Sequence, residues 1–220
     1  MIYSTYKAGN LVEKVKIPEN WNDVPFHKYP DFVELCENGV NGTPEPKEVF
    51  KLMLGISQRM VDSNFKISML EAMNQQLNFL SIAPTVKKRA THFRFKGNNV
   101  RVPNSVSEMK LGKYRDIIET CSAVLTGEEK SVSAMLKTFP EVIAIFCAPE
   151  GYTQTDLDDM SEEIAKFPTP EILVLGNFFM NQFVNLKNGT SANWFKKLIK
   201  TITPTSQLAS VKLLKISATF

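Results

Sequence analysis

Histidines, nucleophile motifs and glycine-rich turns are the usual carriers of enzyme chemistry, and this chain offers few of them. Its two histidines, His27 and His92, are far apart in the sequence, and neither has the HExxH spacing of a metal-binding helix. The chain contains no GxSxG elbow, no P-loop and no GxGxxG turn. Because catalysis needs several convergent groups, we expect a protein that is not an enzyme and that holds neither a cofactor nor a metal.

Carboxylates cluster near the start of one predicted helix, where Asp158 and Glu162 share a helical face. Metal binding or acid–base chemistry is one interpretation of this cluster, but the segment lacks the glycine and the ligand spacing of a calcium-binding loop. The favoured interpretation is an acidic first turn that suits the helix dipole. The cluster comprises Asp156, Asp158, Asp159, Glu162 and Glu163.

The three cysteines, Cys36, Cys121 and Cys147, are odd in number and widely spaced, and they form no CxxC pair. This pattern argues against a disulfide framework or a zinc site and favours a reducing compartment.

A basic hairpin is the sharpest candidate site. Phe93 and Phe95 alternate with Arg94 and Lys96, so one sheet face is predicted to be apolar and the other cationic. The favoured interpretation is a ribbon with its phenylalanines on the core and its charges in water. The alternative is an anion or nucleic-acid patch, although the net charge of +3 does not by itself imply such a partner. The candidate patch comprises Lys87, Lys88, Arg89, Arg94, Lys96 and Arg101.

The C-terminal third is basic and apolar. From Ile164 onward there are seven lysines and a single acid, Glu171. The large apolar residues of this region need cover, either from the protein's own domain or from a partner chain; a membrane surface is a further alternative. Rings and basic residues are common interface anchors, and the candidate protein interface comprises Trp194, Phe195, Lys196, Lys197, Leu213 and Leu214.

Apolar periodicity and end signals predict a mainly α fold of the α+β class. A strand is expected at Leu11–Ile17 and a hairpin at Thr91–Val102, turning at 97–99. Because a lone hairpin is marginal in water, we expect the strand and the hairpin 92–102 to form one small antiparallel sheet. Helices are expected to begin near Pro30 and Val49 and to cover about 67–80, 110–125, 131–147, 156–167, 170–186 and 191–202.

Local sequence signals also predict several details of these helices. Thr155 and Asp158 resemble a capping box, and Thr169-Pro170-Glu171 has the order of a helix start. Pro140 is expected to kink or split its helix. The core is expected to include residues from the apolar stripes, namely Phe50, Leu70, Leu77, Phe93, Phe95, Ile145 and Phe179.

The length of 220 residues suits either an N-terminal lobe, 1–103, and a C-terminal helical lobe, 104–220, or one continuous domain. No signal-peptide pattern and no segment apolar enough to span a bilayer are present in the sequence, so we expect a protein that is not secreted through a signal peptide and does not span a membrane.

A series of loose motifs resembles small proteins from the structural-gene modules of tailed bacteriophages, notably the crAss-like phages of gut Bacteroidota. The resemblance extends over roughly residues 15–185 and rests on turns, caps and one hairpin. Its motifs are Ile17–Val24, Tyr29–Leu35, Leu54–Ser57, Phe93–Val100, Leu111–Tyr114 and Ala144–Gly151.

This resemblance implies a non-enzymatic virion protein, made in the host cytoplasm, whose partners are other phage structural proteins or further copies of itself. Packaged cargo, a ring or connector protein and a tail-associated protein all fit. One alternative is a cytoplasmic tail-assembly chaperone. Another, from a different class, is a nucleic-acid-binding module that uses the basic hairpin.

Overall fold

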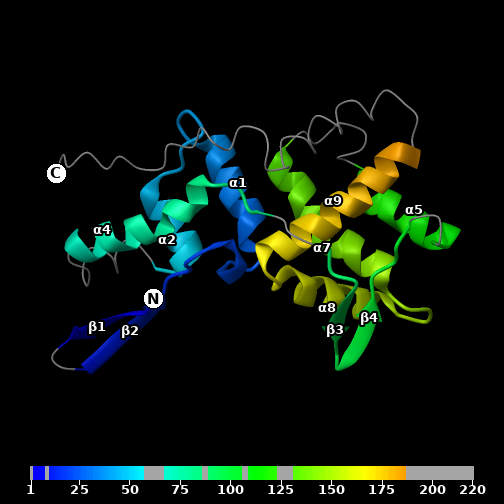
Figure 1. Ribbon diagram of the computed structural model, residues 1–220, viewed down its shortest axis with the longest axis horizontal. Coiled ribbons are helices and arrows are strands. Elements are labelled where there is room, and N and C mark those ends of the chain that lie inside the picture. Colours follow the sequence, from blue (N-terminus) through cyan, green and yellow to red (C-terminus); the bar gives the residue numbers. More distant parts are fainter. Residues whose placement is uncertain are drawn as a thin grey trace.

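Helices dominate the computed structural model, and the only strands in its described part form two small ribbons (Figure 1). The expected mainly α, α+β fold is therefore confirmed. The structure describes residues 2–7, 10–56, 67–85, 89–105, 109–122 and 131–186. The predicted helix at 191–202 lies outside these residues.

The described elements follow one another along the chain in this order. The first half contains β1 (Ile2–Lys7), β2 (Asn10–Lys16), the 3-10 helix η1 (Trp21–Asp23), α1 (Lys28–Asn38), α2 (Pro46–Leu54), α4 (Ile67–Gln76) and the 3-10 helix η2 (Leu77–Ser81). The second half contains β3 (His92–Phe95), β4 (Asn98–Arg101), α5 (Leu111–Thr120), α7 (Val132–Cys147), α8 (Gln154–Ala165) and α9 (Thr169–Leu186).

Helix α7 is the centre of the packing, with α1, α5, α8 and α9 placed around it (Figure 1). Eleven of its 16 residues are buried, so it is apolar on nearly every side, as expected of a helix enclosed by others. The helix runs without a break through Pro140, so it is not split there, and the alternative of a kink at Pro140 stays a prediction. Proline removes one backbone donor, and the packing around the helix outweighs this loss. Among the described helices, none is long and apolar enough to cross a membrane.

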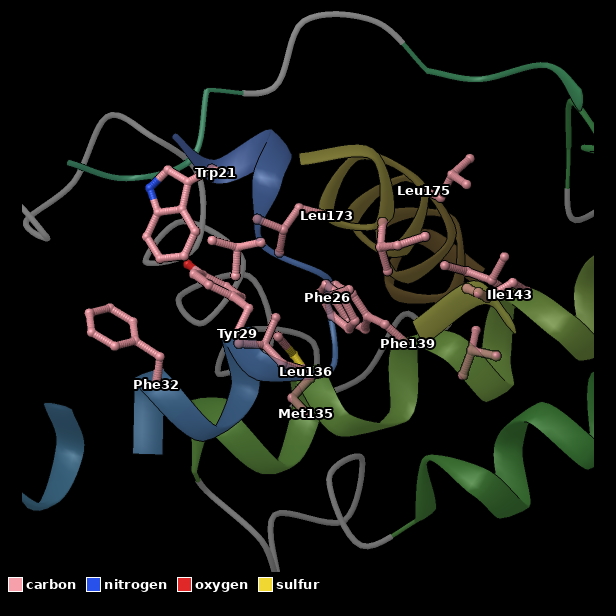
Figure 2. Packing of buried hydrophobic residues seen from close by; sticks show 14 of the residues in the cluster. Trp21, Phe26, Tyr29, Phe32, Met135, Leu136, Phe139, Ile143, Leu173 and Leu175 are labelled. Carbon is pink, nitrogen blue, oxygen red and sulfur yellow. The ribbon is translucent and has the colours of Figure 1, made fainter. Parts of the chain in front are cut away.

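Aromatic rings join the first third of the chain to α7. Phe26 stacks on Phe139 with a centroid distance of 6.1 Å and an interplanar angle of 2°, and Figure 2 shows the two rings side by side. Trp21 meets Tyr29 edge-on at 5.1 Å. Most of the predicted core is confirmed, since six of its seven residues are buried, and only Leu70 is partly exposed.

The chain entering α1 is paired with the chain between α8 and α9. The amide of Phe26 donates to the carbonyl of Phe167 at 2.8 Å, and that of His27 donates to Ala165 at 2.8 Å. The buried hydroxyl of Thr169 donates to the carbonyl of Val24 at 2.8 Å. These bonds connect the two predicted lobes, 1–103 and 104–220; the division into lobes itself stays a prediction.

The predicted joint sheet is wrong. Strand β2 pairs antiparallel with β1, and β3 pairs with β4, in two separate ribbons. Strand β1 ends at Lys7 and β2 begins at Asn10, so pairing these two costs much less chain entropy than bringing β2 to the distant hairpin that begins at His92. The β1–β2 ribbon projects from the helices at the lower left of Figure 1.

The hairpin β3–β4 turns one residue earlier than the sequence suggests. Lys96 and Gly97 form a two-residue turn with φ values of 47° and 81°. Two positive φ values are typical of the type I′ turn, whose twist matches that of the flanking strands. Phe93 consequently lies opposite Val100, and Phe95 lies opposite Asn98 and not opposite a valine.

Candidate protein-binding groove

The two faces of the β3–β4 hairpin differ as predicted. Phe93, Phe95 and Val100 are buried, and Arg94 and Arg101 are exposed on the outer face. Phe93 meets Phe167 edge-on at 6.0 Å, which fixes the ribbon on the chain between α8 and α9. The charged residues of the hairpin therefore face outward because the apolar residues that alternate with them are packed in the core.

Lys96, a member of the predicted cationic patch, is bound to α8. Its ammonium lies 2.7 Å from an Asp159 carboxylate oxygen and 3.4 Å from one of Asp156. The hydrogen bond to Asp159 is the main cause that raises the pKa of Lys96. Both acids already compensate this charge, so Lys96 adds little to an anion-binding surface.

Arg89, a second member, faces α9. Its guanidinium lies 4.1 Å from the centre of the Phe178 ring, a cation–π distance, and donates to the Asn104 side chain at 3.0 Å. Of the six predicted patch residues, the structure thus brings only Arg94 and Arg101 together on one outer face. Lys87 and Lys88 lie outside the described residues, and binding of an anion to this face stays a prediction.

The predicted protein interface in the C-terminal segment lies wholly outside the described residues. It comprises Trp194, Phe195, Lys196, Lys197, Leu213 and Leu214.

Asp156, the first residue of the acidic cluster, helps to cap the N-terminus of α8. The predicted capping box of Thr155 and Asp158 is wrong by two positions, because Thr153 and Asp156 form it instead. The Asp156 amide donates to the Thr153 hydroxyl at 3.2 Å, and the Asp156 carboxylate accepts from the Thr153 amide at 3.1 Å. The hydrogen bonds from Thr153 are the largest cause that lowers the pKa of Asp156. Within the described ranges, no three histidine, cysteine or acidic side chains are grouped so that they could hold a metal.

The three cysteines are free and buried. Burial raises the pKa of Cys36 and of Cys121 to about 11, and that of Cys147 to about 12. Since the thiolate is the reactive form, these side chains are placed as small apolar core residues.

A groove that sequence reasoning missed lies where η1, the chain after η2 and the start of α9 meet. It has a volume of about 550 Å³, with Trp21, Phe79 and Ile82 on its apolar lining. The remaining lining residues are Ala83, Pro170 and Val174, and the polar residues Asn20, Asn22, Thr85 and Glu171.

Trp21 holds the floor of this groove in a fixed position. Its indole N–H donates to the carbonyl of Ile82 at 2.6 Å, and its ring meets Phe79 edge-on at 5.4 Å. Figure 2 shows the indole next to Tyr29 of α1, so the same ring belongs to the core and to the groove. The Ile82 side chain is 66% exposed, one of the few large apolar side chains open to water in the described part of the chain.

Local signals fix the polar edge of the groove. The Asn20 side chain accepts from the amide of Asn22 at 2.8 Å and caps η1. The bond from Thr169 to Val24 places the first turn of α9, and with it Pro170, beside η1. A preformed apolar hollow with a polar edge has the anatomy of a protein-binding hot spot, because it desolvates an incoming apolar side chain at little conformational cost.

Comparison with known proteins adds no relative to this description. No protein-family model matches the chain, and the searches of curated proteins and of solved structures find no match.

Proposed function

We propose that this protein is a non-enzymatic component of a tailed-bacteriophage particle that acts by binding other structural proteins. The groove floored by Trp21 is the observation that carries the binding activity. The phage context rests on the resemblance of the motifs between residues 15 and 185. Packaged cargo, a ring or connector protein and a tail-associated protein are the roles consistent with it.

The groove suits an apolar side chain on a turn or helix end of another particle protein. Ile82 and Val174 would be removed from water by such an anchor. Asn20, Asn22 and Glu171 are positioned to bond with the partner's exposed backbone groups around it. Binding of this kind needs no reacting group, which fits a protein that does not act as an enzyme.

The test is incorporation into purified particles, followed by quantitative mass spectrometry. We expect the wild-type protein at a fixed copy number and a loss of at least about tenfold for Ile82→Glu, since a carboxylate in the groove cannot be desolvated without cost. Leu111→Glu is the matched control, because Leu111 is 82% exposed and lies outside the groove. Equal incorporation of the two variants would contradict the groove as the binding site.

Detection in infected cells but not in particles would favour the alternative, a cytoplasmic tail-assembly chaperone. In that case the groove would hold its client during assembly only. The location of the protein thus decides between the two functions, and the Ile82→Glu variant tests the site in either case.

A nucleic-acid-binding module is the second candidate, and it rests on the outer face of the hairpin. Arg94 and Arg101 are exposed there, and neither makes an ion pair within the described residues. Binding through this face would weaken steeply with salt and would be lost in the Arg94→Glu, Arg101→Glu double variant. Nucleic-acid binding that changes neither with salt nor in the double variant would exclude this face as the binding site.

A further inference from the structure

Lys28 is the first residue of α1 and lies against the C-terminal end of α2, on which α1 packs. Its side chain is half-buried, and its ammonium donates to the carbonyl of Met53 at 2.9 Å. A carbonyl oxygen carries only part of a negative charge, so this bond compensates the loss of hydration less than a carboxylate would. Burial therefore lowers the pKa of Lys28.

This ammonium forms no ion pair with any acid of the described chain. Asp23 lies near it, but the Asp23 carboxylate accepts from the amide of Glu19 at 2.9 Å. Most other lysines of the described ranges differ from Lys28, because a carboxylate stabilises their charged form. The lysines paired in this way are Lys47, Lys51, Lys96, Lys110, Lys137 and Lys166.

Lys113 is the described lysine whose surroundings are most similar to those of Lys28. Its ammonium also donates to a main-chain carbonyl, that of Ala148, and burial is again the main cause that lowers its pKa. The negative charge of Glu150 opposes this effect at Lys113. Burial acts unopposed at Lys28, which makes Lys28 the more readily deprotonated amine of the two.

A small pocket lies beside the Lys28 side chain. It has a volume of about 120 Å³, and four of its other six lining residues are apolar. These six residues are Lys16, Pro18, Asp23, Val24, Pro25 and Met53. A pocket of this size admits an acetyl group and excludes a long acyl chain. Lys28 thus combines a nucleophilic nitrogen with space for a small apolar group.

We propose that Lys28 is a site of spontaneous Nε-acetylation by small acetyl thioesters. A neutral amine is a nucleophile, and a thioester is an uncharged acyl donor whose methyl group suits the apolar wall of the pocket. The Lys28 nitrogen attacks the thioester carbonyl carbon, so that a C–N bond forms and the C–S bond breaks. The sulfur leaves as a thiol and takes up the proton that the nitrogen loses, so the reaction needs no oxidant or reductant.

Acetylation removes the charge of Lys28 but leaves one N–H on the nitrogen. This N–H can still donate to the Met53 carbonyl, so the contact between α1 and α2 is compatible with the modification. The reaction uses neither the Trp21 groove nor the hairpin. It is therefore independent of the proposed function, and either can fail without the other.

The test compares the acetylation rate of each lysine in the folded chain with its rate in the chain unfolded in guanidinium chloride. The probe is S-acetyl-N-acetylcysteamine, and peptide mass spectrometry gives the rates. At about pH 7.5 we expect Lys28 to react at least about threefold faster in the folded chain, because each unit by which a pKa falls yields about tenfold more neutral amine. Lys137, which is paired with Glu34, should react more slowly when folded. A Lys28 that reacts no faster in the folded than in the unfolded chain would overturn the proposal.

A charge introduced into the pocket tests the cause of this reactivity. Lys16→Glu adds a carboxylate to the pocket lining, which favours the charged form of Lys28, so we expect acetylation of Lys28 to slow by at least about threefold. Lys47→Glu is the matched control, since it makes the same charge change at an exposed residue outside the pocket and should leave the Lys28 rate unchanged. Equal Lys28 rates in the two variants would contradict the proposal.

The pH dependence of the wild-type rates provides a check that needs no variant. Burial lowers the pKa of Lys28, whereas the hydrogen bond to Glu45 raises that of Lys47. The acetylation rate of Lys28 should therefore level off at a lower pH than that of Lys47. Coincident pH profiles for the two lysines would show that Lys28 is an ordinary surface amine and would rule the proposal out.

Discussion

A buried thiol links the stability of this protein to alkaline pH. Cys147 is 6% exposed, and burial raises its pKa from 9.0 to about 12. In the unfolded chain the thiol loses its proton near pH 9, whereas in the folded chain it keeps it. At this thiol the folded state therefore binds more protons above this pH, and the contribution of Cys147 to stability falls as pH rises from about 9 toward 12.

We expect this thiol to contribute a slope of up to about 1.4 kcal/mol per pH unit in that window. Urea unfolding between pH 7 and 10.5 measures it. Burial lowers the pKa of Lys28 and of Lys113, so these two side chains change stability with pH in the opposite direction. The difference in slope between the wild type and Cys147→Ala isolates the thiol, and identical slopes would show that it ionises freely in the folded protein.

Glu37, a residue of α1, caps the N-terminus of α7. Its carboxylate accepts from the hydroxyl of Ser131 and from the amide of Val132, both at 2.8 Å, at the first turn of α7. We expect Glu37→Ala to lower the free energy of unfolding by about 1 kcal/mol, because a cap and a favourable charge at the helix dipole are lost together. Glu119→Ala, an exposed acid on α5, should have no measurable effect in the same urea titration.

Helices α7 and α9 can pack closely because Gly176 of α9 has no side chain. A Cβ at Gly176 would overlap the ring of Phe139, which is fully buried and stacked on Phe26. We expect Gly176→Ala to destabilise the protein by about 1–3 kcal/mol, since the ring cannot move without disturbing the core.

Gly112→Ala is the matched control for this helix crossing. Gly112 is also helical, but nothing lies within 4 Å of a Cβ there, so helix propensity alone should stabilise the protein by about 0.5–1 kcal/mol. Thermal unfolding of both variants measures the difference. Similar shifts in the two proteins would show that α7 and α9 do not pack as closely as described.

Helices were the part of the fold that local sequence signals could predict. α7 and α9 follow from apolar periodicity and from start signals such as Ser131 and Thr169, which act within one turn. The pairing of β2 was mispredicted because periodicity identifies a strand but not its partner, and loop closure favours the nearest one. The hairpin turn was misplaced by one residue, since Lys96 is an unusual residue for positive φ.

The groove could not be predicted for a related reason. Its lining comes from three segments, 20–22, 79–85 and 170–174, whose meeting depends on the packing of the helices between them. Only its individual parts carried a local signal, such as the start of α9 at Thr169 and the turn around Trp21. The cationic outer face of the hairpin was predictable because strand alternation is local.

At the scale of the whole molecule, the C-terminal segment is expected to serve assembly more than folding. The described helices end at Leu186, and the buried residues of the described core lie between Val15 and Met180. We therefore expect deletion of 204–220 to preserve the helical circular-dichroism signal while it abolishes incorporation into particles. Normal incorporation of the truncated protein would limit this segment, which lies outside the described residues, to packing within its own chain.

The pairing of residues 24–27 with 165–169 has a consequence for synthesis. When α1 and α2 have been synthesised, Phe26 is still uncovered, because α7, which carries Phe139, and residues 165–169 have not yet been translated. The core of the N-terminal half can therefore form only after nearly all of the described chain has been synthesised. Until then, its aromatic residues are available to chaperones. Nascent chains arrested before Thr169 should be cleaved by protease around Phe26, and chains released in full should be protected there.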